Sequence, residues 1–378
     1  MANVFGVPKE LKPGETRVSL TPDVVNMLVQ DDCTVIIETT AGELSGFSDD
    51  EYKKAGAIVV PTKEEVWAKA DYIIKVKEPQ PCEYELFRED QVIFSYLHLA
   101  VEEELTKALL KKKVCAIASE SVKTANGELP ILRPMSEIAG RMSIQMGATF
   151  LEKQNGGSGV LLGGVPGVQP GKVVVIGGGV VGINAAKTAS GMGADVSVLD
   201  IDSKRLAEID LLFQGRVKTH YCNSTTIMEE SKKADILVGA VLIPNKKAPK
   251  LVGADVIKEM KKGSVVIDVA IDQGGIIETT DAIATLQDPV YEKFGVQHVA
   301  IPNIPSAVPK TASLAYSYAI LPYIKLLAQM GVVVAIKENE ALRAGVNTMR
   351  GCVTCEEVAQ TLNAEHTEIS LLVGFNVK

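Results

Sequence analysis

The stretch Lys172-Val-Val-Val-Ile-Gly-Gly-Gly-Val-Val-Gly-Ile-Asn-Ala-Ala-Lys187 decides the fold of the second half of the chain. Four β-branched residues in a row, 173–176, predict a strand that is buried on both faces. A helix pattern follows over 183–189, and a second strand is expected over 195–199. A strand, a glycine turn, a helix and a second strand form the unit from which doubly wound parallel sheets are built.

The glycine turn has the spacing G-x-G-x-x-G and is followed by an acidic residue where the second strand ends. Gly177 allows the tight turn, Gly179 lets the backbone approach a pyrophosphate, and Gly182 lets the helix pack close to the strand. Asp200 can accept a hydrogen bond from a ribose 2′-hydroxyl and would repel a 2′-phosphate. The context therefore predicts a dinucleotide site that favours NAD over NADP, and the alternative is a glycine-rich turn without a cofactor.

Length and composition indicate a globular protein of roughly two domains. The chain has 378 residues, 46% of them hydrophobic, and a net charge of −8. The only basic cluster is 111–113, which argues against a nucleic-acid partner. No secretory leader precedes the first strand pattern, and the apolar stretch 314–336 is interrupted by polar residues and a proline. We therefore expect a soluble, cytoplasmic protein without a membrane partner.

The six cysteines are scattered, as in proteins of a reducing compartment. Cys352 and Cys355 have the spacing of a redox or zinc motif. No second pair of cysteine or histidine residues lies nearby, so we predict neither a metal nor a redox function there.

Strand and helix patterns alternate along both halves of the chain, which predicts two Rossmann-like domains with mostly parallel sheets of α/β class, linked by long helices. The first domain is expected to be discontinuous, with residues 1–134 and 306–378, and to hold the substrate. Residues 135–305 are expected to form the NAD-binding domain. A long helix over 136–153, with Ser136 as a possible cap, bridges the two, and a second long helix over 311–330 returns to the first domain.

Polar residues follow several predicted strands, where doubly wound folds bind their ligands. Arg17 follows the first strand, Lys75 and Lys77 follow another, and His98 follows a third. The second domain offers 268–275, with Asp268 and Asp272. Arginine and lysine can hold a carboxylate and polarise a carbonyl, and histidine can move protons, so these residues suit a dehydrogenase.

Each of these residues also has a simpler interpretation. Arg17 could be a surface ion-pair partner, and the two lysines could share a solvated face. His98, between two leucines, could be a hydrogen-bonded core histidine, and Asp272 could be a turn residue beside two glycines. These residues by themselves support only an NAD-dependent dehydrogenase.

Seven segments resemble the bacterial alanine dehydrogenase family in order and spacing, from near residue 4 to about residue 360. The broader group also includes the soluble nucleotide-binding part of proton-translocating transhydrogenase. The resemblance implies reversible oxidative deamination of L-alanine to pyruvate and ammonium with NAD, and a homohexamer. The segments are 6–22, 71–79, 94–100, 134–148, 159–168, 173–186 and 268–275.

The resemblance also implies a function for individual residues. Arg17 and Lys77 would bind the substrate carboxylate and carbonyl, and His98 and Asp272 would be the acid/base pair. Ser136 would contact a cofactor phosphate, Asp200 the adenosine ribose and Arg205 the adenine side. The remaining residues expected at the cofactor are Gly177, Gly179, Val180, Val181, Gly182, Cys222, Val241, Leu242, Val269, Asp272, Asn303 and Ile304.

The chain departs from the family pattern at a few positions, and two other functions are possible. Pro302 and Ile304 stand where the family commonly has Ala and Met, and Arg133 replaces a small residue. Cys222 stands where a serine often touches the ribose. The alternatives are a transhydrogenase nucleotide-binding subunit and a silent relative that only binds NAD; the segments 96–100 and 134–142 resemble the dehydrogenase form.

Overall fold

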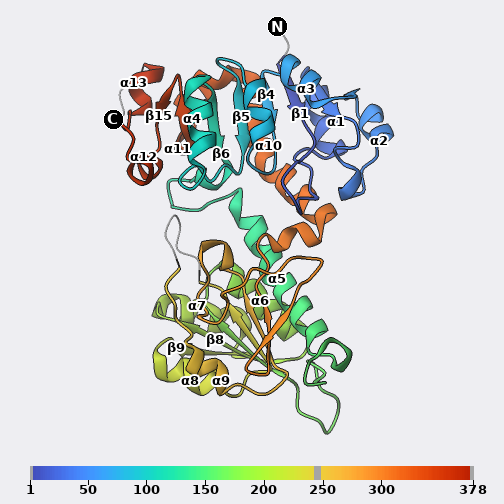
Figure 1. The fold of residues 1–378 in the computed structure, drawn as a ribbon, viewed down its shortest axis with the longest axis vertical. Coiled ribbons are helices and arrows are strands. Elements are labelled where there is room, and N and C mark those ends of the chain that lie inside the picture. The colour runs from blue at the N-terminus through green and yellow to red at the C-terminus, as the bar shows by residue number, and fades with distance from the viewer. Residues whose placement is uncertain (1–2, 242–247, 375–378) are drawn as a thin grey trace. The chain divides into compact units, whose positions relative to one another are not determined.

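A computed structural model of the chain describes residues 3–241 and 248–374. The chain divides into two compact units (Figure 1). The first unit consists of Met1–Met135 and Ser306–Lys378, and the second unit is Ser136–Pro305.

The second unit is built around a seven-stranded sheet in the order β12-β13-β11-β10-β7-β8-β9. All neighbouring strands are parallel except β12 and β13. Alternate residues of β7 belong to two separate apolar cores, so both faces of the sheet are covered, as its unbroken β-branched sequence predicts. The strands are β7 (Lys172–Ile176), β8 (Asp195–Asp200), β9 (Val217–Tyr221), β10 (Ile236–Gly239), β11 (Val265–Asp268), β12 (Tyr291–Lys293) and β13 (Val296–Val299).

The first unit has an eight-stranded sheet in the order β15-β14-β6-β5-β4-β1-β2-β3. Strands β1 to β6 are parallel; β14 pairs antiparallel with β6, and β15 pairs antiparallel with β14. The strands are β1 (Val4–Val7), β2 (Thr34–Glu38), β3 (Ile58–Val60), β4 (Tyr72–Ile74), β5 (Val92–Ser95), β6 (Cys115–Ala118), β14 (Val346–Met349) and β15 (Cys352–Val353).

The two sheets share one strand order, and the prediction of two mostly parallel Rossmann-like sheets is confirmed. In the first unit the parallel strands run β3-β2-β1-β4-β5-β6, and in the second they run β9-β8-β7-β10-β11-β13. In each unit the order reverses beside the first strand, between β1 and β4 and between β7 and β10. Ligands of doubly wound sheets bind outside the carboxyl ends of the strands at this reversal.

The helices connect the strands and cover the sheets (Figure 1). Helix α2 begins with a capping box, in which Ser48 and Glu51 satisfy each other's backbone N–H groups. Helix α1 begins after Thr21 with Pro22 at its first position, although the Thr21 hydroxyl makes no capping hydrogen bond. The α-helices of the first unit are α1 (Pro22–Gln30), α2 (Asp49–Lys54), α3 (Lys63–Lys69), α4 (Glu103–Lys111), α10 (Pro309–Glu338), α11 (Glu340–Gly345), α12 (Glu356–Leu362) and α13 (Ile369–Val373), and those of the second are α6 (Val180–Gly191), α7 (Ser203–Phe213), α8 (Ser224–Ser231) and α9 (Ala254–Lys258).

Helix α5 (Leu132–Phe150) carries the chain from the first unit into the second. It begins four residues before Ser136, so the prediction that Ser136 caps this helix is wrong. Pro134 is the third residue of the helix, where its missing N–H costs nothing because the first turn has no partner for it. Farther along α5, a glycine is required at position 140 for close packing against α6, because a Cβ there would lie 2.2 Å from the carbonyl oxygen of Val181.

Helix α10 packs in the first unit, as predicted for the second long helix. Its backbone breaks at Gly331, which has φ 70° and ψ 161°. Among the described residues, α10 is the one helix long and apolar enough to cross a membrane by length and composition. Tyr316, Ile320 and Leu327 on it are buried in the first unit, although only 33% of its most apolar window is buried.

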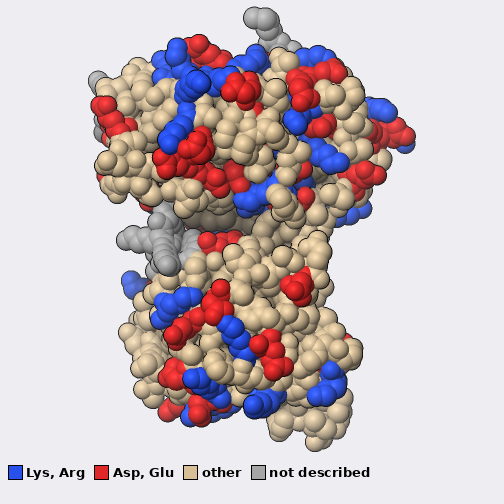
Figure 2. Space-filling model, in the orientation of Figure 1, with Lys and Arg blue, Asp and Glu red and all other residues tan. Residues whose placement is uncertain are grey.

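Charged side chains of both signs are interspersed over the face shown in Figure 2. Lys and Arg lie among Asp and Glu on each unit, and the sequence has 39 basic and 47 acidic residues. The basic cluster 111–113 ends α4, and two of its lysines pair with Glu85 and Glu89. This mixed surface does not favour nucleic acid as a partner.

Candidate functional site

In the turn between β7 and α6, a different structural feature favours glycine at each of the three motif positions. Gly177 has φ +102°, a left-handed conformation that other residues rarely adopt. A Cβ at Gly182 would lie 1.8 Å from the carbonyl oxygen of Gly177, so the helix can approach the turn only without a side chain there. A Cβ at Gly179 would meet nothing within 4 Å, which leaves room for a ligand to approach the backbone at the start of α6.

Asp200 lies at the end of β8 beside this turn. Its Oδ2 accepts a hydrogen bond from the Gly178 N–H at 2.6 Å, and its Oδ1 accepts from the Asp202 N–H at 2.9 Å. These contacts fix the carboxylate against the glycine turn. Arg205 pairs with Glu208 at 2.7 Å on the exposed side of α7. Cys222 donates its backbone N–H to the Asp200 carbonyl, and burial, together with Asp200, raises the pKa of its thiol.

Other residues expected at the cofactor follow neighbouring strands at the same edge. Val241 follows β10 and Val269 follows β11, and both are half-buried. Asn303 has φ 58° and is half-buried, whereas Ile304 is 2% exposed and packs in the core of the second unit. Leu242 lies outside the described residues. Val180 and Val181 begin α6, and the half-buried Ser136 lies in α5.

Asp272 lies in a single 3-10 turn, η5 (Ile271–Gln273), directly after β11, and is exposed. The loop that carries it is closed by the buried Asp268, whose carboxylate accepts from the Ile276 and Ile277 N–H groups and from the Thr280 hydroxyl. The Asp268 carboxylate therefore stabilises the loop. Asp272, unlike Asp268, is exposed to solvent.

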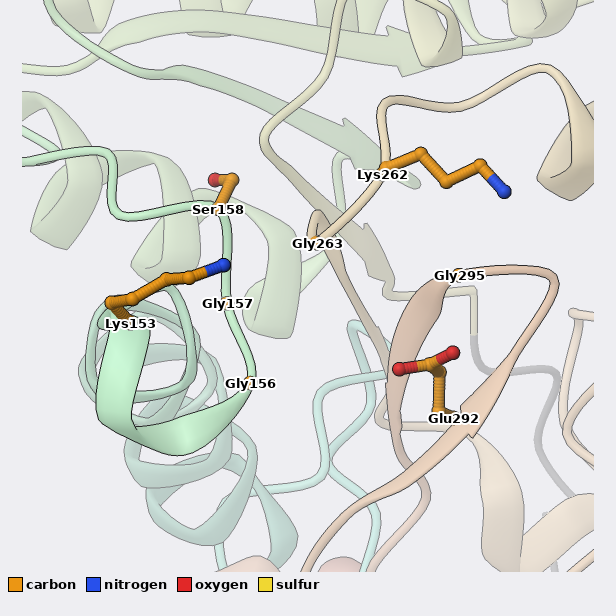
Figure 3. A pocket seen from close by; sticks show the side chains of 8 residues that line it. All are labelled: Lys153, Gly156, Gly157, Ser158, Lys262, Gly263, Glu292 and Gly295. Carbon is orange, nitrogen blue, oxygen red and sulfur yellow. The ribbon is translucent and has the colours of Figure 1, made fainter.

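A dinucleotide fits the edge of the second unit on which these residues lie. The open backbone at Gly179 and the N-terminus of α6 suit a pyrophosphate, and Asp200 suits a ribose hydroxyl. A pocket of about 310 Å³ lies at the opposite edge, before β11 and at the turn between β12 and β13 (Figure 3). Since it adjoins the amino ends of the parallel strands β11 and β13, it is not the expected cofactor site. Its lining is Lys153, Gly156, Gly157, Ser158, Lys262, Gly263, Glu292 and Gly295.

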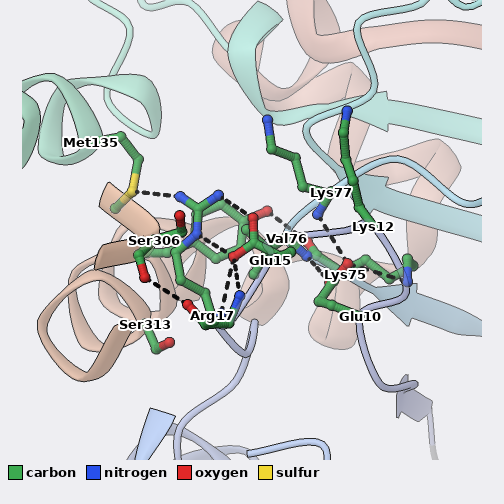
Figure 4. Close-up of polar contacts among 12 residues, drawn as sticks. Glu10, Lys12, Glu15, Arg17, Lys75, Val76, Lys77, Met135, Ser306 and Ser313 are labelled. Carbon is green, nitrogen blue, oxygen red and sulfur yellow. Dashed lines mark hydrogen bonds and ion pairs between the residues drawn. The ribbon is translucent and has the colours of Figure 1, made fainter. Parts of the chain in front are cut away.

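Arg17 in the first unit is 3% exposed and paired with Glu15 (Figure 4). Its Nε donates to Glu15 Oε1 at 2.7 Å, and its Nη2 donates to Oε2 at 2.6 Å. Its Nη1 lies 3.2 Å from the sulfur of Met135. The simpler interpretation of Arg17 as a surface ion-pair partner is wrong, because a buried and doubly hydrogen-bonded guanidinium has a fixed plane.

Lys75 and Lys77 follow β4, and their side chains have different surroundings. Lys75 is fully buried, with its Nζ 3.3 Å from Glu10 Oε2 and 3.4 Å from Glu83 Oε1. Lys77 is half-buried. The interpretation of both lysines as a solvated face is therefore wrong for Lys75, and Lys77 is the one that reaches toward solvent.

His98 follows β5 in a left-handed backbone conformation, with φ 50°. Glu120 accepts hydrogen bonds from the N–H groups of Leu97 and His98, and its Oε1 lies 3.8 Å from Nδ1 of the ring. The side chain of His98 is 41% exposed, so the interpretation as a core histidine is wrong. A strained backbone that presents an exposed imidazole is typical of functional sites.

The structure brings three candidate residues of the first unit to neighbouring positions. Arg17 follows β1, Lys77 follows β4 and His98 follows β5, and these three strands are adjacent in the sheet. The reversal of strand order lies between β1 and β4, where ligands are expected. Glu15 and Glu120, which hold two of these residues, were not predicted from the sequence. Only the close spacing of Glu15 and Arg17 could have indicated one of them.

Each unit thus has a doubly wound sheet with a reversal of strand order, the place where such folds bind ligands, and the glycine turn of the second unit is typical of dinucleotide-binding α/β proteins. Models of the alanine dehydrogenase/PNT N-terminal and C-terminal domains match residues 6–139 and 143–356. The chain belongs to the alanine dehydrogenase/PNT family, and this family uses a nicotinamide dinucleotide as cofactor.

Relatives of the same length are similar over nearly the whole chain. An alanine dehydrogenase of Methanococcus maripaludis is 54% identical over 96% of this chain and 98% of its own length, and that of Staphylococcus saprophyticus is 52% identical over 97% and 98%. A solved L-alanine dehydrogenase is 49% identical, with a TM-score of 0.92 over 95% of this chain and 99% of that one. A transhydrogenase from Sinorhizobium meliloti is 26% identical, with a TM-score of 0.82 over 93% and 100%.

Proposed function

We propose that the chain catalyses the reversible oxidative deamination of L-alanine with NAD. In this reaction L-alanine, NAD⁺ and water give pyruvate, ammonium, NADH and a proton. The observation that carries the proposal is the 54% identity to an alanine dehydrogenase over 96% of the chain, together with the convergence of Arg17, Lys77 and His98 at one sheet edge. The first unit then holds the substrate, and the second holds the cofactor.

The second unit would hold the cofactor by its glycine turn and Asp200. The N-terminus of α6 would bind the pyrophosphate, with Gly179 giving the close approach. Asp200, fixed by the N–H groups of Gly178 and Asp202, would accept from the adenosine ribose and disfavour a 2′-phosphate. The nicotinamide supplies the acceptor and donor of a hydride.

Arg17 and Lys77 would bind the substrate in the first unit. The guanidinium of Arg17, with its plane set by Glu15, binds the carboxylate that alanine and pyruvate share. The ammonium of Lys77 hydrogen-bonds the carbonyl oxygen of pyruvate and polarises that bond for attack by ammonia. The two cations orient one small anion, which favours a short 2-oxo acid.

His98 and Asp272 would move the protons. In the deamination direction, a base must take a proton from water as it adds to the imine, and an acid must protonate the leaving amine of the carbinolamine. His98 suits this exchange because an imidazole ring can both accept and donate a proton, and its side chain is 41% exposed on a left-handed backbone that follows β5. Asp272 of the second unit is exposed, and its carboxylate would hold the water and accept a proton from it.

One assay tests this function. Purified protein should oxidise NADH only when both pyruvate and ammonium are present, and should reduce NAD⁺ with L-alanine. Glyoxylate and 2-oxobutyrate, run alongside, measure how far the site accepts other short 2-oxo acids. Failure to turn over either substrate pair in either direction would reject the proposed reaction.

A transhydrogenase nucleotide-binding subunit is the second candidate, since that protein shares the fold. The identity of 26% to the transhydrogenase, against 49–54% to alanine dehydrogenases, favours the first candidate. A subunit of this second kind would bind NADH but would leave pyruvate and ammonium unchanged, so the same assay separates the two.

We further expect a cytoplasmic homo-oligomer, with a hexamer implied by the family resemblance. Light scattering coupled to size-exclusion chromatography measures the mass directly against the 40.4 kDa of one chain. A mass of one or two chains at assay concentrations would contradict the hexamer.

A further inference from the structure

Three buried charged groups in the first unit form a cluster next to the segment that carries Lys77. Lys75 at the end of β4 is fully buried and lies between two carboxylates, Glu10 of the loop after β1 and Glu83 of η2 (Pro81–Leu86). The side chains of Glu10 and Glu83 are 5% and 0% exposed. Two carboxylates therefore share one ammonium, and the cluster has an excess of one negative charge when all three groups are ionised.

Such a cluster is not explained by stability. Burying ions costs several kcal/mol each, and well-packed apolar residues commonly do as well or better. Glu10 has a second set of contacts that points to another function. Its Oε1 accepts from the Val76 N–H at 2.6 Å, and its Oε2 lies 3.4 Å from the Lys77 N–H.

The backbone that carries Lys77 is thus held from several sides. The Lys75 N–H donates to the Phe94 carbonyl of β5, and the Lys75 carbonyl accepts from the Tyr316 hydroxyl of α10 at 3.0 Å. The Glu10 carboxylate accepts hydrogen bonds from the N–H groups of Val76 and Lys77. Figure 4 shows Glu10 beside Val76 and Lys75. Glu10 also lines a cavity of about 10 Å³ with Glu15 and Arg17, which has room for about one water.

We propose that Glu10 is a positioning residue for substrate binding: its carboxylate, balanced by the buried Lys75, holds the Val76–Lys77 backbone so that the Lys77 ammonium meets the substrate carbonyl. The proposal rests on the proposed function, in which Lys77 binds the 2-oxo acid. In this proposal, Glu10 and Lys75 fix the position of Lys77 and make substrate binding depend on pH.

The pH dependence follows from the groups that face Glu10. Burial raises the pKa of Glu10 to about 7, Lys75 opposes the shift, and Glu15 and Glu83 add to it. Lys75 comes from β4, Glu83 from η2, Glu15 and Arg17 from the loop after β1, and Tyr316 from α10.

Above pH 7 both oxygens of Glu10 accept hydrogen bonds and the anion faces Lys75. Below pH 7 a proton occupies one oxygen, the attraction to Lys75 is lost, and the hold on the Lys77 backbone weakens. Substrate affinity should therefore fall as the pH falls through 7.

Equilibrium binding of oxamate, an unreactive analogue of pyruvate, tests this in the presence of NADH. For the wild-type chain the dissociation constant should rise by up to about tenfold for each pH unit below a midpoint near 7. Glu10→Gln puts an amide N–H₂ where an acceptor is needed. It should weaken oxamate binding roughly tenfold at pH 8, as expected for a lost hydrogen bond to a charged group, and abolish this acid dependence.

Glu83→Gln is a second test, in which the midpoint of the acid dependence is measured. It removes a negative charge that raises the pKa of Glu10, so the midpoint of the acid dependence should move to lower pH. The amide oxygen of the substituted side chain can still accept from the Gln80 N–H, which Glu83 now binds at 2.8 Å. The matched control is Glu85→Gln, because Glu85 is 88% exposed and pairs with Lys112 at the surface. It should behave as wild type.

Melting curves and NADH affinity measured on every variant separate folding from positioning. An acid dependence that stays unchanged in both Glu10→Gln and Glu83→Gln belongs to another group and overturns the proposal. If Glu10→Gln fails to fold, the midpoint in Glu83→Gln decides alone. A wild-type chain that neither binds oxamate nor oxidises NADH with pyruvate and ammonium rejects the proposed function instead, and this inference with it.

Discussion

The two units have the same order of parallel strands, but different chemical groups lie at the corresponding edge of each sheet. In the second unit the edge is made of backbone, where Gly179 is open and Gly182 could carry no side chain. In the first unit the edge is made of charged side chains, where Arg17 and Lys75 are buried in ion pairs. In this fold the loops that follow the strands lie at one edge of the sheet. The residues of these loops determine which ligand the edge suits: backbone N–H groups suit a phosphate, and cationic side chains suit a small carboxylate.

The largest effect should come from the two residues proposed to transfer protons, one from each unit. His98→Ala and Asp272→Asn should each lower kcat by roughly 10²–10⁴-fold, the usual contribution of a general acid or base. His366→Ala is the control, since His366 lies near β15 and its Nε2 is 3.3 Å from the Thr354 carbonyl. Steady-state rates with pyruvate, ammonium and NADH measure the change. A loss of tenfold or less would remove that residue from the acid/base pair.

Arg17→Lys tests whether the first unit recognises a carboxylate through a fixed planar group. Lysine keeps the charge but cannot make the paired hydrogen bonds to Glu15, so kcat/KM for pyruvate should fall about tenfold to hundredfold. NADH affinity should not change, because the second unit is untouched. Arg216→Lys, at an exposed arginine, is the matched control. If Arg17→Lys kept wild-type kcat/KM, a guanidinium would not be required there.

Asp200→Gly tests the sugar-binding end of the second unit. NAD⁺ should bind more weakly, and the preference for NAD over NADP should relax by about tenfold, since a hydrogen bond to a charged group is worth roughly 1.5–3 kcal/mol. The exposed Asp210→Gly serves as control for the lost charge and for a glycine in this region. Rates with each cofactor give the preference directly, and an unchanged ratio would contradict the assignment to the ribose.

The smallest effect, a shift of melting temperature, compares two glycines of one turn. Gly182→Ala forces a Cβ against the Gly177 carbonyl and should cost about 1–3 kcal/mol, as overpacking does. Gly179→Ala meets open space and should cost less than about 1 kcal/mol, yet it should weaken NADH binding. Thermal melts with and without NADH distinguish them. Equal melting temperatures for the two variants would mean that the turn can relax around the new side chain.

The sequence predicted the second unit better than the first for a physical reason. The dinucleotide turn depends on contacts within about 30 residues, so its glycines and Asp200 could be read from local spacing. The cluster of Glu10, Lys75 and Glu83 joins residues distant in sequence, and no local pattern indicates that Lys75 is buried. For the same reason β14 and β15 were not predicted: they are short, and β14 is ordered by pairing with β6. Helix α5 was predicted to start at Ser136, four residues too late, although Pro134 is compatible with its first turn.

The discontinuous first unit has a consequence for synthesis on the ribosome. Its sheet is completed by β14, and the hydroxyl of Tyr316 reaches the Lys75 carbonyl from α10, so both contacts must wait for the last part of the chain to emerge. The second unit is one continuous segment and can fold as soon as residue 305 has left the exit tunnel. We therefore expect the cofactor-binding half to mature first during translation, with the amino-terminal half held incomplete until termination is near.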